Sequence, residues 1–271
     1  MTDQAALQTA PLGSICTQVD GSISWLIVDN EPKKNALSLA MWQAVPEAVN
    51  QLSGDPAIRL IVLRGAGSES FVAGADISEF EATRSTAEKA KTYDEINVAA
   101  CEALKAAEKP TLAMIRGHCL GGGLALALAC DMRIAAQGSQ FGIPAARLGL
   151  AYPLGLVTDA LRAVPASTAK RLIFTAERLG SEEALRLGLI DELVAEAELE
   201  NRTRALAKTI SANAPLTLRA AKIAINALSE GASPESLAAA QSAADTCFDS
   251  ADFIEGRTAF LEKRKPVFEG R

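Results

Sequence analysis

The chain has 271 residues, of which 49% are hydrophobic and 22% charged, a composition typical of a globular protein with a sizeable core. Its net charge of −6 argues against a global basic field for nucleic acid, and we expect no nucleic-acid partner. The five scattered cysteines do not have the spacing of a disulfide framework or a metal site, so we expect no metal. No signal-like start and no apolar run of membrane length are found, so we expect a cytoplasmic protein without membrane contact.

Strand and helix patterns alternate through the first half of the chain. Residues 1–14 are expected to form a loose arm. Helices are expected from Ser38 to about Leu52, with Pro46 as a kink or early break, and from the capping-box pattern at 85–88 to about residue 107. Short apolar runs predict strands at Ser22–Val28, Leu60–Leu63, Leu112–Ile115 and Met132–Ala135. This alternation predicts an α/β fold with right-handed crossovers.

After about Leu148 the apolar residues recur at helical spacing only. Ser233-Pro234 has the form of a helix start, with serine as N-cap and proline at the first helical position. We therefore expect a β/α core over residues 1–200 and a helical region over residues 201–271. The expected helices are Leu154–Arg162, Ser167–Thr175, Ser181–Leu187, Glu196–Ala212, Pro215–Leu228, Pro234–Asp249 and Asp252–Lys263.

Two glycine-containing segments are the strongest candidates for chemistry. One reads Phe-Val-Ala-Gly-Ala-Asp-Ile over 71–77, and the other is Gly117 to Ala125 with three consecutive glycines. Each follows a strand, and the second opens a helix, where unpaired N–H groups and the helix dipole favour negative charge. Two such groups aimed at one point would stabilise the oxyanion formed from a carbonyl. The alternative is that the glycines only allow helix and strand to pack closely.

Taken together, these segments resemble the crotonase (enoyl-CoA hydratase/isomerase) superfamily. Further matching motifs follow in the same order over nearly the whole chain: Asn-Glu-Pro-Lys-Lys-Asn-Ala-Leu at 30–37, Asp-Pro-Ala-Ile-Arg-Leu-Ile-Val-Leu at 55–63, Cys-Asp-Met-Arg-Ile at 130–134, Gln-Phe-Gly-Ile-Pro at 140–144 and Glu-Gly-Arg-Thr-Ala-Phe-Leu-Glu-Lys-Arg-Lys-Pro at 255–266. The resemblance implies a spiral of ββα turns with a helical C-terminal trimerisation region. It also implies a homotrimer or a hexamer made of two trimers.

The resemblance further implies roles for single residues. The backbone N–H groups that donate hydrogen bonds to a thioester oxygen would be those of Ala75 and Gly122, flanked by Gly74 and Gly121. Coenzyme A, which is part of the substrate and not a separate cofactor, would be contacted around Lys34, Ala36, Ala73, Asp76 and Ile77. Phe260 and Lys263 would reach coenzyme A from a neighbouring subunit, although Lys263 could equally belong to a solvated helix end.

The chain departs from the hydratase pattern at two positions. The two glutamates that resembling hydratases use to activate water and deliver a proton fall on Ala125 and Ala145, and alanine can do neither. Tyr152 follows closely, in a stretch that resembles methylmalonyl-CoA decarboxylases of the family. A buried tyrosine hydroxyl with a structural partner is the alternative for this residue.

Other residues offer weaker substitutes for the missing acids. Arg147 could pair with a substrate carboxylate, and Glu79 or Glu81 could supply a carboxylate from a loop. For all three residues, a charged side chain at the surface is the simpler interpretation. Asp159 and His118, the single histidine, are more simply read as structural residues.

Three functions remain open on this basis. The first is hydratase-like chemistry on an enoyl-CoA. The second is decarboxylation or isomerisation through the same enolate, and the third is acyl-CoA binding without catalysis. Ala125, Ala145, Leu148 and Leu150 predict an apolar pocket with few polar groups, which favours an apolar acyl chain.

Overall fold

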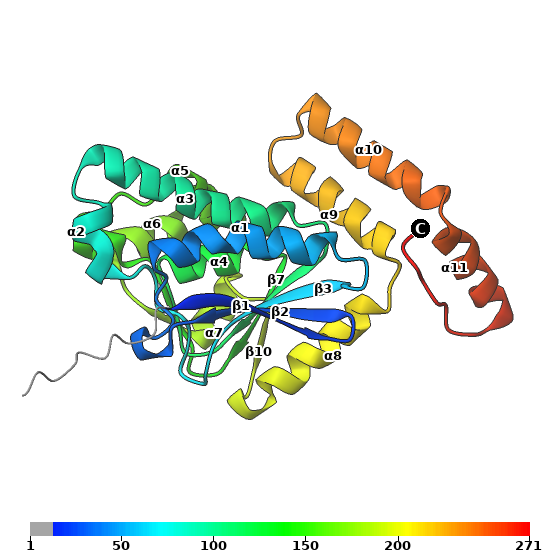
Figure 1. Cartoon of the computed structure of the whole chain (residues 1–271), viewed down its shortest axis with the longest axis horizontal. Coiled ribbons are helices and arrows are strands. Elements are labelled where there is room, and N and C mark those ends of the chain that lie inside the picture. Colours follow the sequence, from blue (N-terminus) through cyan, green and yellow to red (C-terminus); the bar gives the residue numbers. More distant parts are fainter. Residues whose placement is uncertain (1–12) are drawn as a thin grey trace, which may run out of the picture.

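The computed structural model describes residues 13–271 (Figure 1). Residues 1–12 of the expected N-terminal arm therefore lie outside the described part, and Ser14 begins the first strand instead of ending the arm. Within the described range, none of the helices combines the length and the apolar character needed to cross a bilayer.

Ten strands form two sheets among the described residues. The six-stranded sheet has the order β1-β2-β3-β5-β7-β10 and the four-stranded sheet the order β4-β6-β8-β9. Neighbouring strands are parallel, except for the antiparallel pairs β1–β2 and β8–β9. The bounds are β1 (Ser14–Asp20), β2 (Ile23–Asp29), β3 (Leu60–Gly65), β4 (Ser70–Val72), β5 (Thr111–Ile115), β6 (His118–Leu120), β7 (Met132–Ala136), β8 (Gln140–Gly142), β9 (Leu179–Gly180) and β10 (Glu192–Val194).

The helices lie between and around these strands. Short 3-10 turns also occur, and two of them border the candidate site: η2 (Ile77–Glu79) and η3 (Pro144–Leu148). The α-helices are α1 (Leu39–Gly54), α2 (Phe80–Thr83), α3 (Ala87–Ala106), α4 (Gly122–Ala129), α5 (Leu154–Ala163), α6 (Ala166–Thr175), α7 (Ser181–Leu187), α8 (Leu199–Ser211), α9 (Pro215–Ser229), α10 (Pro234–Phe248) and α11 (Ala251–Glu262).

The chain repeats one pattern as it moves between the two sheets. A strand of the large sheet is followed by a strand of the small sheet and then by helix, as in β3–β4–α3, β5–β6–α4 and β7–β8–α5. Each repeat moves one position along both sheets, because β3, β5 and β7 are neighbours in one sheet and β4, β6 and β8 in the other. The expected spiral of ββα turns is therefore present.

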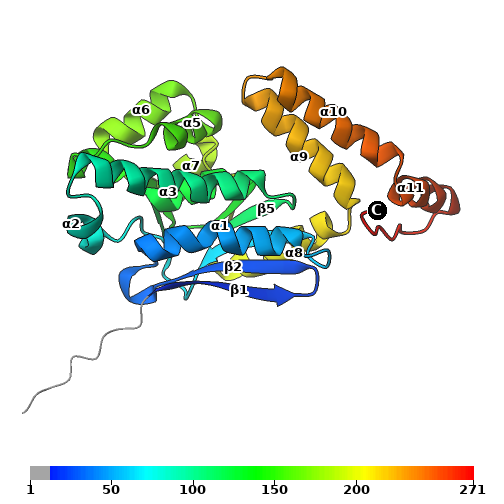
Figure 2. The same cartoon turned by 45° about the horizontal axis from the view of Figure 1, so that its top comes forward.

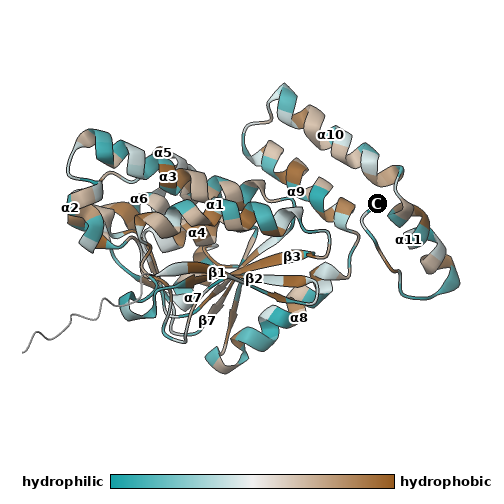
Figure 3. Cartoon of the chain, in the orientation of Figure 1, coloured by the Kyte–Doolittle hydropathy of each residue, from teal (hydrophilic) through white to brown (hydrophobic). Residues whose placement is uncertain are grey.

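The large sheet buries apolar residues on both faces. Successive side chains of a strand point to opposite faces, so Leu60 and Val62 of β3 pack with residues of α8, whereas Ile61 and Leu63 face the main core with α1, α3 and α4. In Figure 3 the strands are mainly hydrophobic, and the solvent side of α8 is hydrophilic. Burial on both faces explains why these strands read as continuous apolar runs in the sequence.

The last three helices extend away from the sheets. Both views show α9 and α10 lying side by side, with α11 at the end of the molecule opposite α2 (Figures 1 and 2). The division expected at residue 200 falls within α8, which packs on the large sheet, and it stays a prediction.

The local predictions from the sequence had mixed outcomes. The side chains of Ser38 and Ser233 do cap α1 and α10. Pro46 does not interrupt α1, which continues to Gly54. The N-cap of α3 is Thr86, whose hydroxyl accepts from the Lys89 N–H, so the capping-box reading was shifted by one residue.

Candidate active site

The two glycine-containing segments meet at the ends of neighbouring strands. β4 and β6 run parallel, with Val72 paired to Cys119. Each strand then leads into one of the segments, 73–75 after β4 and 121–123 after β6. Because the carboxyl ends of parallel strands meet at the same edge of a sheet, segments almost fifty positions apart in the sequence lie side by side.

The first segment leaves one N–H group without a partner. Leu37 forms an isolated parallel bridge with Ala75, in which the Leu37 N–H donates to the Gly74 carbonyl and the Asp76 N–H donates to the Leu37 carbonyl, both at 2.8 Å. The bridge engages the residues on either side of Ala75, so the Ala75 N–H points the other way. It makes no hydrogen bond to any residue in the described part of the chain.

The second segment exposes an N–H at the start of a helix. Gly121, with φ 51°, is the N-cap of α4, and its own N–H donates to the Gly142 carbonyl at 2.8 Å. Gly122 is the first helical residue, so its N–H has no partner inside the helix and none elsewhere in residues 13–271. A Cβ at Gly122 would lie 2.5 Å from the ring of Trp42, which explains why glycine is needed there.

A cavity of about 100 Å³ is lined by both Ala75 and Gly122, the residues that carry these two N–H groups. Its wall is mainly apolar and is formed by both glycine-containing segments together with η3, α2, α3 and the start of α5. The residues of the predicted site that line it are Ala73, Gly74, Ala75, Ile77, Gly121, Gly122, Ala145, Leu148 and Tyr152.

Tyr152 lies just before α5 and turns its hydroxyl towards the second segment. The hydroxyl donates to the Gly121 carbonyl at 3.3 Å, and the same carbonyl accepts from the Ala125 N–H at 3.0 Å. Burial raises the pKa of Tyr152 well above its usual range, so the phenol stays protonated as a donor. Tyr152 therefore bonds to the peptide whose nitrogen carries the free Gly122 N–H.

Comparisons with known proteins agree on one family. The sequence profile described as "Enoyl-CoA hydratase/isomerase" matches residues 20–271. The chain belongs to the enoyl-CoA hydratase/isomerase family. A short-chain-enoyl-CoA hydratase of Clostridium acetobutylicum is 33% identical, covering 94% of this chain and 97% of that protein. A carnitinyl-CoA dehydratase of Escherichia coli K12 is 32% identical, covering 93% and 97%.

Solved structures of the family share the fold. An enoyl-CoA hydratase/isomerase family protein from Hyphomonas neptunium superposes with a TM-score of 0.90 at 37% identity, over 95% of this chain and 98% of that chain. An enoyl-CoA hydratase/carnithine racemase from Magnetospirillum magneticum gives 0.89 at 33% identity, over 96% and 97%. The expected fold class, an α/β spiral with a helical C-terminal region, is confirmed.

The remaining residues of the predicted site lie outside this cavity. In this member of the hydratase/isomerase family, Ala36 and Ala125 are buried in the core, and Asp76 is buried beside Lys33, whose ammonium lies 2.5 Å from its carboxylate. Lys34 lines a second hollow, of about 350 Å³. Phe260 and Lys263 are exposed at α11, at the opposite end of the chain from α2.

Apart from Tyr152, none of the sequence-based substitutes for the family's glutamates lines the cavity. The Glu79 carboxylate accepts from the N–H of Leu39, 2.7 Å away, and so stabilises the start of α1. Glu81 and Arg147 are exposed. His118 has a ring nitrogen 3.1 Å from the Ser70 hydroxyl, and burial lowers its pKa.

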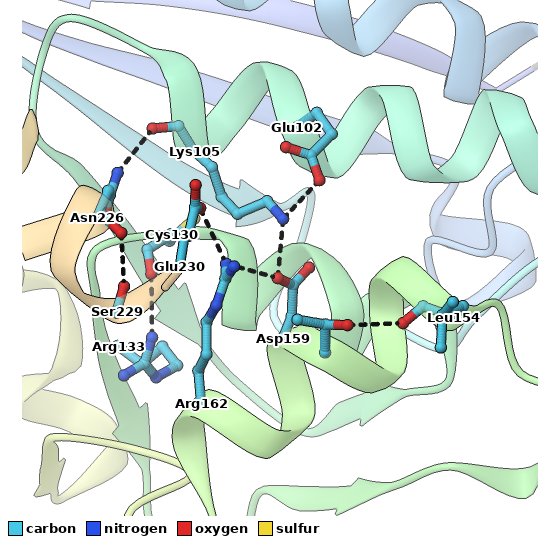
Figure 4. Close-up of polar contacts among 11 residues, drawn as sticks. Glu102, Lys105, Cys130, Arg133, Leu154, Asp159, Arg162, Asn226, Ser229 and Glu230 are labelled. Carbon is cyan, nitrogen blue, oxygen red and sulfur yellow. Dashed lines mark hydrogen bonds and ion pairs between the residues drawn. The ribbon is translucent and has the colours of Figure 1, made fainter. Parts of the chain in front are cut away.

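Asp159 is also engaged elsewhere. Figure 4 shows its carboxylate facing Lys105 of α3 and Arg162 of α5, with N–O distances of 2.8 and 3.3 Å. Arg162 in turn contacts Glu230 after α9, at 3.2 Å. This charged cluster joins α3 and α5 to the C-terminal helices and lies away from the cavity lining, so it has a structural role.

Three polar residues that the sequence did not lead us to predict also line the cavity: Arg84, Tyr93 and Asn97. Arg84 pairs with Asp94, and its guanidinium lies over the rings of Phe80 and Tyr93, 5.2 and 4.4 Å from their centroids. Tyr93 and Asn97 are four residues apart on the buried face of α3. A polar pair within an otherwise apolar helix face was the available signal.

No carboxylate or histidine lines the cavity among the described residues, and those residues hold no cluster of histidine, cysteine, aspartate or glutamate suited to a metal ion.

Proposed function

We propose that this protein transforms an acyl-CoA thioester by hydratase-like chemistry, holding the thioester oxygen between the N–H groups of Ala75 and Gly122. The observation that carries the proposal is that both groups lack a partner within residues 13–271 and both residues line one cavity. The relatives named as hydratases and dehydratases of CoA thioesters support this substrate class.

Two donors in this position stabilise the charge that develops on the carbonyl oxygen when the thioester becomes an enolate. The N-terminus of α4 adds the favourable end of a helix dipole at Gly122. The apolar wall excludes water, which strengthens both interactions. Removing a single donor of this kind typically lowers the rate by about 10²–10³.

The absence of a carboxylate from the described cavity wall makes a second reaction worth testing. Ala145 lines the cavity and Ala125 is buried in the core, and an alanine side chain has no group that can activate water. Loss of carbon dioxide from a malonyl-type thioester forms the enolate directly and needs no base. Decarboxylation is therefore the second candidate, and it uses the same two N–H groups.

Coenzyme A would lie along the two neighbouring segments that carry Lys34, Ala36, Asp76 and Ile77, with Ile77 at the edge of the cavity. Ile77 is 55% exposed beside the cavity, which suits a contact with the pantetheine arm. Phe260, 83% exposed on α11, would contact the coenzyme of a neighbouring subunit together with Lys263. This part of the proposal requires a trimer or hexamer, which light scattering of the purified protein measures. We also propose a cytoplasmic location.

The function is tested by incubating the protein with crotonyl-, longer 2-enoyl-, 3-enoyl- and methylmalonyl-CoA and measuring the mass of each thioester. A gain of water identifies hydratase chemistry, and a loss of carbon dioxide identifies decarboxylation. Isomerisation of a 3-enoyl-CoA leaves the mass unchanged, so the position of the double bond is determined by NMR as well. Unchanged mass together with an unchanged double-bond position for every bound thioester identifies binding without turnover.

The role of the two N–H groups has its own test. Infrared spectra of a ¹³C-labelled thioester carbonyl are recorded free and bound. Two donors polarise the carbonyl and shift its band to lower frequency. A thioether analogue that lacks the carbonyl should bind more weakly. An unshifted band together with equal binding of the thioether contradicts the proposed site.

A further inference from the structure

Helix α3 presents two polar side chains to the otherwise apolar cavity. Tyr93 and Asn97 are one helical turn apart, so they project from the same face. They are only 2% and 6% exposed, and both line the cavity. The other buried residues of this face, Ala100, Cys101 and Leu104, continue into the apolar core.

Neither polar group is fully satisfied within the described protein. The indole N–H of Trp42 lies near the Tyr93 oxygen and can donate to it, but the Tyr93 hydroxyl proton has no acceptor among residues 13–271. The Asn97 side-chain oxygen makes no hydrogen bond to any of these residues. A buried polar atom without a partner destabilises the folded state, and proteins rarely keep one without a reason. Two of them, side by side on the wall of a cavity, indicate that a ligand completes their hydrogen bonds.

The chemistry of the pair limits what that ligand group can be. Burial raises the pKa of Tyr93 to about 12, so its hydroxyl is a neutral donor at physiological pH, while the Asn97 oxygen is an acceptor. A hydroxyl group matches both, because it accepts from a phenol and donates to an amide oxygen.

A carboxylate fits less well. It cannot donate to the Asn97 oxygen, so the Asn97 amide would have to turn its NH2 group towards it, and it would seek a positive charge. The nearby cation is Arg84, whose charge is matched by Asp94 and whose side chain is 9% exposed beneath the aromatic rings. One Arg84 N–H, that of Nε, also lacks a partner among the described residues, and it would add a second donor to the same hydroxyl oxygen.

We propose that Tyr93 and Asn97 bind a hydroxyl group on the acyl chain of the substrate, close to the thioester. The cavity of about 100 Å³ contains both this pair and the two N–H groups, so a hydroxyl bound here lies only a few bonds from the carbonyl. This corresponds to a 3-hydroxyacyl-CoA, the hydrated partner of a 2-enoyl-CoA. The inference rests on the proposed function and deepens it, because it assigns two residues that hold the hydroxyl group of the hydrated thioester and so favours hydration over decarboxylation.

The test compares ligands that differ only in the hydroxyl. Dissociation constants are measured by calorimetry for 3-hydroxybutyryl-CoA, butyryl-CoA and methylmalonyl-CoA with the wild type and with Tyr93→Phe and Asn97→Leu. The phenylalanine keeps the ring packing on Phe80 and Arg84, so the variant should fold, which circular dichroism checks. Tyr152→Phe is the matched control, because it removes from the same cavity a hydroxyl that is already bonded to the protein.

The wild type should bind the hydroxyacyl ligand about tenfold or more tightly than butyryl-CoA, since an unmatched buried polar group weakens binding by about this factor. Tyr93→Phe and Asn97→Leu should reduce the preference to within about twofold, and Tyr152→Phe should leave it unchanged.

Three outcomes would overturn the inference. If butyryl-CoA binds as tightly as the hydroxyacyl ligand, or if Tyr93→Phe keeps the preference, the pair does not bind a hydroxyl, although the acyl-CoA function stands. If methylmalonyl-CoA is preferred and Tyr93→Phe abolishes that preference, the pair binds a carboxylate. If none of the three thioesters binds, the proposed function fails as well.

Discussion

Replacing Tyr152 by phenylalanine removes one hydroxyl from the cavity wall and keeps the ring. The hydroxyl donates to the Gly121 carbonyl at 3.3 Å, and that carbonyl also accepts from the Ala125 N–H. The variant therefore leaves no carbonyl without a partner. A single hydrogen bond of this kind contributes about 0.5–1.5 kcal/mol, and we expect a loss of unfolding free energy in that range.

The expected effect on catalysis follows from the shared peptide. The Gly121 carbonyl and the Gly122 N–H belong to one peptide group, and a hydrogen bond at the carbonyl strengthens the N–H as a donor by about 10–30%. A donor to an oxyanion contributes about 2.7–4 kcal/mol. This fraction of the donor's contribution is about 0.3–1.2 kcal/mol, and losing it corresponds to a fall in kcat of about two- to eightfold with little change in KM.

The alternative role for Tyr152 predicts a much larger loss. A side chain that transfers a proton contributes about 10²–10⁴ in rate. The assay is kcat and KM for the most reactive acyl-CoA between about pH 6 and 9, for wild type and variant, alongside urea unfolding. Because the pKa of Tyr152 is raised well above its usual range, the positioning role leaves the pH profile unchanged. A fall of more than about 100-fold in a folded variant, or a lost limb of the profile, refutes the reasoning.

Two further predictions concern stability. Gly122→Ala places a methyl group 2.5 Å from the Trp42 ring and should lower the unfolding free energy by about 1–3 kcal/mol. The control is Gly54→Ala, which has open space around it and no positive φ and should raise the unfolding free energy by up to about 1 kcal/mol. Equal changes for the two variants in urea unfolding would contradict the packing argument. Burial would raise the pKa of Asp76, but hydrogen bonds to its charged carboxylate outweigh this effect, so the pKa is lowered in the folded protein. The contribution of the charged Asp76 to the free energy of unfolding is therefore complete above the ordinary aspartate pKa of about 3.9, and it is lost as the pH falls through the lower pKa of the folded state. Asp76→Asn should therefore be less stable than the wild type at about pH 6 and approach it at about pH 3, and a constant difference would exclude this origin.

The candidate site could be predicted from the sequence because some of its positions can be occupied only by glycine. The residue at 122 must be glycine because Trp42, far away in the sequence, packs against it, and a requirement for glycine is visible in the sequence even when its cause is not. The strands β3, β5 and β7 could also be predicted from the sequence, because strands buried on both faces consist of continuous apolar runs. The strands β4, β6 and β8 have three residues each, too few to show any period, and pairing with neighbours far along the chain determines them.

The functional roles of Tyr93 and Asn97 could not be predicted from the sequence for the same reason, because they depend on contacts with distant residues. Helical periodicity places them on the face of α3 that carries Ala100 and Leu104, but it does not show what that face contacts. Their partners in the wall, such as Tyr152 and Gly122, are distant in sequence. Only packing of α3 against the spiral places these polar groups in the cavity.

The sequence by itself determined the alternation of strands and helices and the two glycine-containing segments, because backbone geometry and apolar burial constrain residue types locally. The order of its motifs gave the family resemblance, which in turn implied the ββα spiral. The tertiary structure decided which side chains share the cavity. It placed Glu79 at the start of α1 and Asp159 in an ion-pair cluster, and it gave Tyr152 a backbone carbonyl as its partner. These are long-range contacts, and a long-range contact is fixed only when the whole chain packs.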